Sequence, residues 1–263
     1  MTRVTMSPVP VVLRNGAGIA DPLTVVLGFG RAWGHLDAGD PVAPTAFGEP
    51  DLRLANRGGA RISAAQIAEI LERRGAIEGA LRAIPPDVSL AGAADSVPWP
   101  VLRELFDAFA GIRGVGFAKM TKALYPKRRA LIPMLDSIVQ AYLRDDDPGA
   151  DVPFGERALA LVHGYKRDLD RNWAAMRAIR EELARRGEEL TEVRIFDLLI
   201  LSAAARPGGG LPAGRMRRGR GHARLAVREK FLIERSAELG GWPGPNRSIP
   251  RRTGRRRSGR TRS

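Results

Sequence analysis

One short stretch in the folded part of this chain carries basic residues and no acidic ones. Residues 108–135 contain no acidic residue and are bounded by Asp107 and Asp136. The stretch contains six cationic side chains, namely Arg113, Lys119, Lys122, Lys127, Arg128 and Arg129. Over residues 1–205, 26 basic residues balance 26 acidic ones, so this concentration predicts contacts with phosphate groups. For residues 127–129, a solvated loop with no ligand is an equally good interpretation.

A glycine-rich turn lies inside this basic stretch. Residues 111–116 read Gly-Ile-Arg-Gly-Val-Gly. Gly114 and Gly116 allow dihedral angles that other residues avoid, while Val115 is expected to be buried as a plug. The helix after the turn would begin with backbone N–H groups that have no partner, and such groups suit a phosphate. Arg113 and Gly114 to Gly116 are therefore predicted to contact a duplex without reading its sequence, although such a turn often has no ligand.

The pair Asp136-Ser137 could carry chemistry or could only begin a helix. An apolar face of Ile138, Val139 and Tyr142 follows it, and Asp and Ser are common caps of such helices. A carboxylate beside a phosphate-binding turn could instead act as a general base or stabilise a developing positive charge. Both interpretations of Asp136 stay open at this point.

These elements resemble the helix-hairpin-helix DNA glycosylase superfamily over about residues 97–144. The turn is similar to that family's Leu-Pro-Gly-Val-Gly signature, with Arg113 in place of the proline. Leu135-Asp136-Ser137-Ile138-Val139 resembles its hydrophobic–Asp–Thr/Ser–x–Val element, and Asp136 lies 22 residues after Gly114, close to the family's spacing. The family's cluster-ligating cysteines are absent, as they are in its cluster-free branches.

The resemblance implies a double-stranded DNA partner and a base extruded from the duplex. Asp136 would be the catalytic carboxylate of a glycosylase-like hydrolase. The bifunctional branch has a nucleophilic lysine where this chain has Ala118, so the resemblance implies a monofunctional enzyme. The chain is also similar to an uncharacterised bacterial family with Lys-Arg and Ile-Pro before an Asp-Ser pair, here Lys127-Arg128 and Ile132-Pro133. That second resemblance covers most of the body and implies no activity.

Apolar residues at helical spacing predict the elements that would position these groups. Helices are expected at residues 22–33, 64–74, 76–84, 100–110 and 117–124, after Asp136, in a long segment through residues 169–183, and after Thr191. Ser63 and Gln66 are expected to form a capping box. Residues 36–60 are expected to be irregular, with a short hairpin pairing residues 52–54 with 60–62. Trp99 and Trp173 are expected to be core residues. The sequence thus predicts an all-α, helix-hairpin-helix glycosylase-like body of two small lobes over residues 1–205.

Residues 206–263 differ from the body in composition. They contain 17 basic and 3 acidic residues among many Gly, Pro and Ser, so a disordered basic arm is expected, with one helix-capable segment at 223–239. The arm either adheres to polyanions or has no function. The absence of Cys excludes disulfides and thiolate metal sites, and three scattered His give no ligand spacing. No metal, cofactor or membrane span is expected, and a cytoplasmic location is favoured.

Three functional hypotheses follow. The first is a DNA-binding helix-hairpin-helix protein in which Asp136 performs base excision. The second is a non-catalytic DNA-binding or structural module of the same fold. The third is a helical protein-interaction domain whose basic stretch binds an acidic partner. The oligomeric state is left open.

Overall fold

The computed structural model of the protein describes residues 10–33, 37 and 43–205, and the expectations for the arm at 206–263 lie outside the described residues. The described part is mostly helical. One antiparallel pair of two-residue strands, β1 (Val11–Val12) and β2 (Gly18–Ile19), precedes the helices. The helices are α1 (Pro22–Trp33), α2 (Glu49–Arg57), α3 (Ala64–Glu72), α4 (Arg74–Ala83), α5 (Trp99–Asp107), α6 (Phe117–Leu124), α7 (Ser137–Tyr142), α8 (Phe154–Arg171), α9 (Trp173–Arg185) and α10 (Glu192–Ala205). Three short 3-10 helices, η2 (Ala94–Ser96), η3 (Tyr125–Lys127) and η4 (Arg144–Asp146), lie between them.

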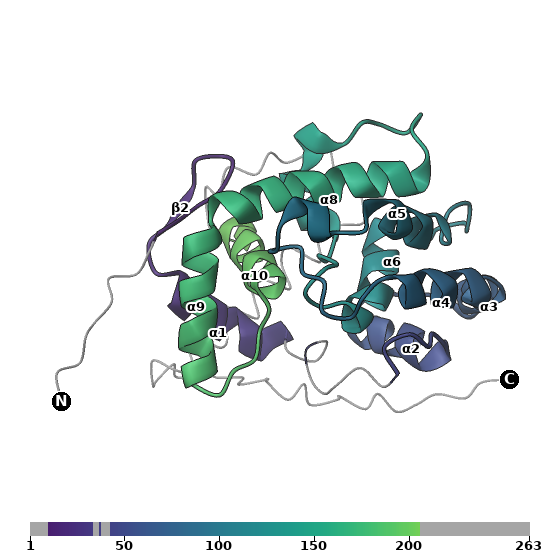
Figure 1. Ribbon diagram of the computed structural model, residues 1–263, viewed down its shortest axis with the longest axis horizontal. Helices are drawn as coiled ribbons and strands as arrows, with labels where there is room; N and C mark the ends of the chain where they lie inside the picture. The colour runs from purple at the N-terminus through teal and green to yellow at the C-terminus, as the bar shows by residue number, and fades with distance from the viewer. Residues whose placement is uncertain (1–9, 34–36, 38–42, 206–263) are drawn as a thin grey trace, which may run out of the picture.

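Helix α8 links two groups of elements. Figure 1 shows α8 running along one side of the molecule, with α1, α9 and the strands near one of its ends and α2 to α6 near the other. Helix α5 packs on α8, and α2 packs on α6. The main hydrophobic cluster takes residues from both groups, so one continuous core joins them.

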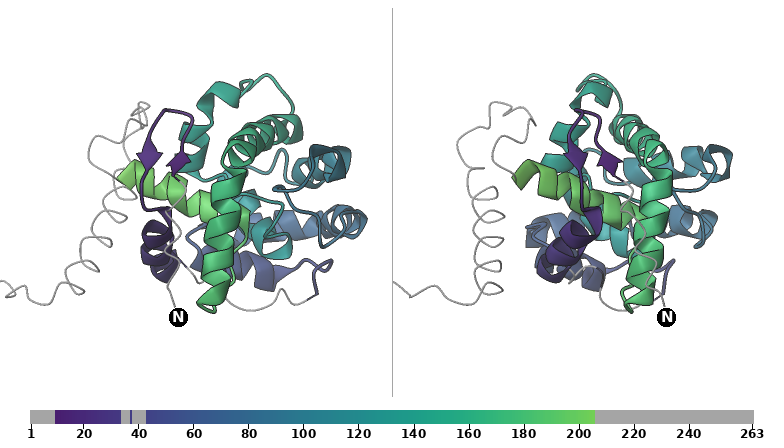
Figure 2. Two further views of the ribbon diagram at one scale, coloured as in Figure 1. Left: turned by 60° about the vertical axis from the view of Figure 1, so that its left-hand side comes forward. Right: turned by 90° about the vertical axis from the view of Figure 1, so that its left-hand side faces the viewer.

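Helix α10 lies in the middle of this core. Every residue from Glu192 to Ala203 is buried, including Arg194 and Asp197. Figures 1 and 2 show α10 crossing the molecule close to α1 and α9, and it also packs against α7 and α8. A helix that is apolar nearly all round belongs inside a protein, so its three charged side chains, Glu192, Arg194 and Asp197, require internal partners.

Many of the expected helices are confirmed. Helices α1 and α6 have the predicted bounds. The capping box at the start of α3 is present, with the Gln66 amide donating to Ser63 Oγ at 3.3 Å and the Ser63 amide donating to Gln66 Oε1 at 3.1 Å. Asp136 and Thr191 cap α7 and α10 as expected. The all-α expectation is thus confirmed apart from the β1–β2 pair.

The hairpin expected at residues 52–54 and 60–62 is wrong, because residues 49–57 form α2. Leu52 and Ala55, three residues apart, share its buried face. The Asp51 carboxylate accepts a 2.9 Å hydrogen bond from the Gly48 amide and so caps the start of the helix. The two leucines that suggested a strand therefore lie in a short helix, where Leu52 is buried and Leu54 is half-buried.

The single long helix expected through residues 169–183 is also wrong. Asn172 breaks it, so that α8 ends at Arg171 and α9 begins at Trp173. The Asn172 side-chain amide donates to the Asp168 and Val12 carbonyls at 2.9 and 3.0 Å. Trp173 is 40% exposed and is not a core residue, whereas Trp99 is half-buried and stacks on His163 with ring centroids 4.0 Å apart.

Candidate functional site

The glycine turn, residues 111–116, joins α5 to α6 and presents its backbone to solvent. Gly111 and Gly114 have φ values of +74° and +75°, which other residues adopt only with strain. The Val115 amide donates to the Ile112 carbonyl at 3.0 Å, and both of these side chains are buried. Arg113, Gly114 and Gly116 are exposed. The plug predicted at Val115 and an accessible turn backbone are therefore both present.

The first amides of α6 follow directly after this turn. Gly116 precedes the helix in an extended conformation and contributes no side-chain cap. Its carbonyl accepts from the Lys119 and Met120 amides at 3.0 and 3.1 Å. The amides of Gly116, Phe117 and Ala118 donate to no acceptor within the described part of the chain. Unpaired donors at the positive end of a helix dipole are suited to an anion.

Gln66, at the start of α3, holds the turn in place. Its Nε2 donates to the Arg113 carbonyl at 2.8 Å, and its Oε1 accepts from Lys119 Nζ at 2.6 Å. A methyl group at Gly114 would come within 2.8 Å of Gln66 Nε2. The sequence identified Gln66 only as part of a capping box, because a contact across 47 residues leaves no local pattern.

Replacing Gly114 with alanine is expected to cost about 1–3 kcal/mol of unfolding free energy. Both the left-handed dihedral angle and the contact with Gln66 would oppose the new methyl group. Gly116→Ala is the matched control, since φ is −111° there and no atom lies within 4 Å of the added carbon. Urea denaturation would measure both variants, and equal midpoints would contradict the role given to Gly114.

The two lysines of α6 are tied to neighbouring elements. Lys119 binds Gln66 as described, and partial burial lowers its pKa. Lys122 Nζ donates to the Gly58 carbonyl at 2.9 Å, and burial lowers its pKa as well. Both are half-buried and support the turn and the α2–α3 connection. The Lys119 ammonium group lies near the turn and that of Lys122 lies at the α2–α3 connection, and both already have protein partners.

The basic run at residues 127–129 lies mainly inside the protein. Lys127 is buried and pairs with Asp51 across 2.8 Å. Arg128 is 2% exposed, and its guanidinium donates to backbone carbonyls of Pro44, Leu81 and Ile84. Arg129 is half-buried. The solvated-loop interpretation of this run is therefore wrong, and Lys127 and Arg128 hold the body together from within.

Asp136 acts as the N-cap of α7. Its Oδ1 accepts hydrogen bonds from the Ile138 and Val139 amides at 2.9 and 3.0 Å. Burial raises the pKa of this carboxyl, while the two amides and nearby Lys122 oppose the shift. The residue is half-buried. The helix-capping interpretation of Asp136 is thus present in the structure.

The space beside Asp136 is small. A cavity of about 20 Å³ is lined by Gly58, Lys122, Met134, Asp136, Val139, Arg194, Asp197 and Leu201. A volume of this size holds roughly one water molecule. A nucleobase would not fit without a rearrangement of the surrounding helices.

A family model describes the body that carries these features. Residues 26–203 match a family of unknown function, DUF6308. The chain belongs to this family. The match agrees with the expected resemblance to an uncharacterised family and includes the glycine turn and Asp136. No curated protein and no solved structure matched the chain.

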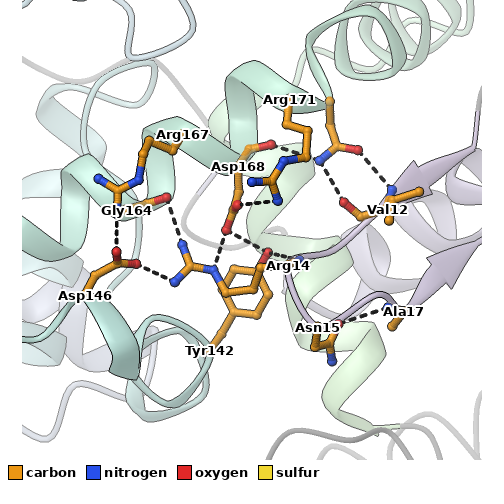
Figure 3. A network of polar contacts seen from close by, with 11 residues as sticks. Val12, Arg14, Asn15, Ala17, Tyr142, Asp146, Gly164, Arg167, Asp168 and Arg171 are labelled. Carbon is orange, nitrogen blue, oxygen red and sulfur yellow. Dashed lines mark hydrogen bonds and ion pairs between the residues drawn. The ribbon is translucent and has the colours of Figure 1, made fainter.

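A polar network that the sequence did not reveal joins Arg14, which precedes the DUF6308 match, to residues inside the match. Arg14, in the loop between β1 and β2, donates through Nε to Asp168 Oδ2 at 2.6 Å and through its other nitrogens to Asp146 and the Gly164 carbonyl. Figure 3 shows these groups together with Tyr142, whose hydroxyl donates to Asp168 at 3.0 Å. Asp146 approaches α8 so closely that a Cβ at Gly164 would clash with its carboxylate.

This network attaches the strand pair to the DUF6308 body. The cleft around it has a volume of about 300 Å³, but its buried carboxylates already accept from arginines of the chain. The Val12 amide also donates to Asn172 Oδ1 at 2.9 Å. The network is therefore structural.

Among the described residues, no group of acidic, His or Cys side chains could hold a metal, and no helix is long and apolar enough to cross a membrane.

Proposed function

We propose that the protein binds the backbone of duplex DNA through the glycine turn and the start of α6. The observation that carries this proposal is the exposed turn, in which Gly116 leaves room for a phosphate beside three amides that have no acceptor among the described residues. Arg113 is exposed on the same turn and makes no ion pair within the described residues. Such contacts position a duplex without selecting a sequence.

In this proposal the turn acts as the hairpin of a helix-hairpin-helix module and Asp136 has a structural role. One carboxylate oxygen of Asp136 already caps α7, and the adjacent cavity has room for about one water molecule. Both observations favour the non-catalytic alternative over base excision. Release of a damaged base by the wild-type protein but not by Asp136→Asn would reverse this preference.

Charge reversal at Arg113 tests the proposal. We expect Arg113→Glu to weaken binding of a short duplex about 10-fold at low salt. The dependence of the binding constant on salt concentration should also decrease, by the amount that corresponds to roughly one phosphate contact. The unfolding free energy should change little, because the side chain is exposed. Fluorescence anisotropy over a series of salt concentrations measures both quantities.

The control is Arg177→Glu, a charge reversal on a 65% exposed arginine of α9. Figure 1 shows that α9 lies away from α6. Both variants are made in the full chain and in a chain ending at residue 205, whose fold is first checked by circular dichroism. Equal losses of duplex affinity in the two variants would remove the glycine turn from the interface. Binding that occurs only when residues 206–263 are present would do the same. A body that binds no duplex at all would favour the protein-interaction alternative.

A further inference from the structure

Asp197 is a buried acidic residue that the proposed DNA contact does not use. It lies in α10 and is 1% exposed. Its Oδ1 is 3.0 Å from the Tyr165 hydroxyl, and its Oδ2 accepts from the Met134 amide at 3.2 Å. A carboxylate in such a place carries a large desolvation cost unless it is paired or neutral.

The hydroxyl of Tyr165 has one proton and two neighbouring oxygens. It is 2.7 Å from the Val193 carbonyl and 3.0 Å from Asp197 Oδ1. A backbone carbonyl can only accept, and the shorter contact is the one to Val193, so the hydroxyl proton belongs in that bond. The contact to Asp197 then needs a proton from the carboxyl group, with Tyr165 as the acceptor.

A second tyrosine–aspartate pair in the same core provides a comparison. The Tyr125 hydroxyl is 2.5 Å from Asp37 Oδ1, and Arg194 Nε donates to Asp37 Oδ2 at 2.8 Å. Hydrogen bonds to an ionised carboxylate are short, about 2.5–2.7 Å from O–H and 2.7–2.9 Å from a cationic N–H. Asp37 has this geometry, whereas the contact of Asp197 with the Tyr165 hydroxyl is longer, at 3.0 Å.

The groups around Asp197 contribute charges of both signs. Arg194, Tyr165 and Asp136 act electrostatically on Asp197, and Lys122 lines the same cavity. Tyr125 and Tyr142 act on Tyr165, and Glu192 of α10 pairs with Arg180 of α9. Burial raises the pKa of Asp197 to about 7, with Arg194 acting in the opposite direction. The water-sized cavity that Asp197 shares with Asp136 provides room for the water that would exchange this proton.

We propose that Asp197 is a neutral carboxylic acid in the folded protein and that its ionisation weakens the contact between α10 and Tyr165 of α8. The sign follows from linkage. The folded protein holds this proton more tightly than the unfolded chain does, because the group has a higher pKa when folded. Its contribution to stability is therefore complete below about pH 4 and is lost as the pH rises from about 4 to about 7, above which the stability no longer depends on this group's proton.

The Asp197→Asn variant tests whether the native side chain is a neutral acid or an ionised carboxylate. Asparagine reproduces the neutral acid's pattern, since its NH2 can donate to Tyr165 and its oxygen can accept from Met134. We expect the variant to unfold near the wild-type temperature at about pH 4, near the pKa of aspartate in the unfolded chain. The difference in Tm should then grow by roughly 3 °C per pH unit in favour of the variant, until it levels off above about pH 7. Asp145→Asn, at a 75% exposed carboxylate, should follow the wild type throughout.

Two results would overturn the proposal. A variant that is less stable than the wild type by the same amount at every pH would show that the ionised carboxylate is needed. An unchanged pH dependence would assign the proton to another group.

Infrared spectroscopy of the folded wild-type protein tests the same point without relying on the variant's stability. With 13C-labelled aspartate, a carbonyl band of a protonated, buried carboxyl should be present at about pH 6, should fade as the pH rises through about 7, and should be absent from Asp197→Asn. Absence of this band from the folded wild type at about pH 6 would exclude the neutral acid.

Discussion

The Arg128→Met variant should be about 3–5 kcal/mol less stable than the wild type. The guanidinium satisfies the carbonyls of Leu81 and Ile84 at the end of α4 and that of Pro44 in the segment before α2. Methionine would fill the space but donate no hydrogen bond, so buried acceptors would be left without partners. Denaturant unfolding followed by tryptophan fluorescence measures the loss.

Arg113→Met is the matched control for this prediction. It removes a guanidinium from the same basic stretch, but from an exposed position on the glycine turn, so its unfolding free energy should lie within about 0.5 kcal/mol of the wild type. Arg128→Met protein that unfolds like the wild type but binds duplex less tightly would place Arg128 at the DNA surface and contradict the internal role.

Removal of the Asp168 carboxylate is expected to lower the unfolding free energy by an amount similar to that for Arg128→Met. Asp168 is 2% exposed and accepts hydrogen bonds from Arg14, Tyr142 and Arg171. In Asp168→Ala, Arg14 keeps its ion pair with Asp146 but loses the one with Asp168. We expect the unfolding free energy to fall by about 3 kcal/mol and the β1–β2 segment to be cleaved faster by proteases. Denaturant unfolding and limited proteolysis followed by mass spectrometry measure the two effects.

A double variant distinguishes the buried charge from the contact itself. Arg14→Met with Asp168→Leu removes both charges and should recover much of the lost stability, because paired charges replaced by apolar groups are often neutral in stability. Arg171→Gln, which changes a 58% exposed partner of Asp168, should cost less than about 1 kcal/mol. A double variant as unstable as Asp168→Ala would show that the contacts rather than the unpaired charge dominate.

Local signals in the sequence predicted the elements whose ends are fixed by near neighbours. The bounds of α6 follow from the glycines before it and its apolar face, and Ser63 with Gln66 marks the start of α3. The same kind of signal failed at residues 52–62. There, the nine residues of α2 are too few to show a clear helical period, and Leu52 and Leu54 alternate as they would in a strand.

The positions of the basic side chains could not be predicted, because their partners are distant in the sequence. Lys127 pairs with Asp51, and Arg128 binds carbonyls that are 44 to 84 residues away. A run of cations is usually solvated, and only the packing of α2 and α4 around η3 places these two inside. The exposed Arg113 was the exception, since the turn that presents it is local.

The hydrogen bonds between Val12 and Asn172 have a consequence for the order of folding during synthesis. The two residues are 160 positions apart, so Val12 leaves the ribosome long before its partner exists. At about 5–20 residues per second, the interval is roughly 8 to 32 seconds. The first strand therefore spends that time without its native neighbours, and the core around α10 can close only when nearly the whole body has been translated.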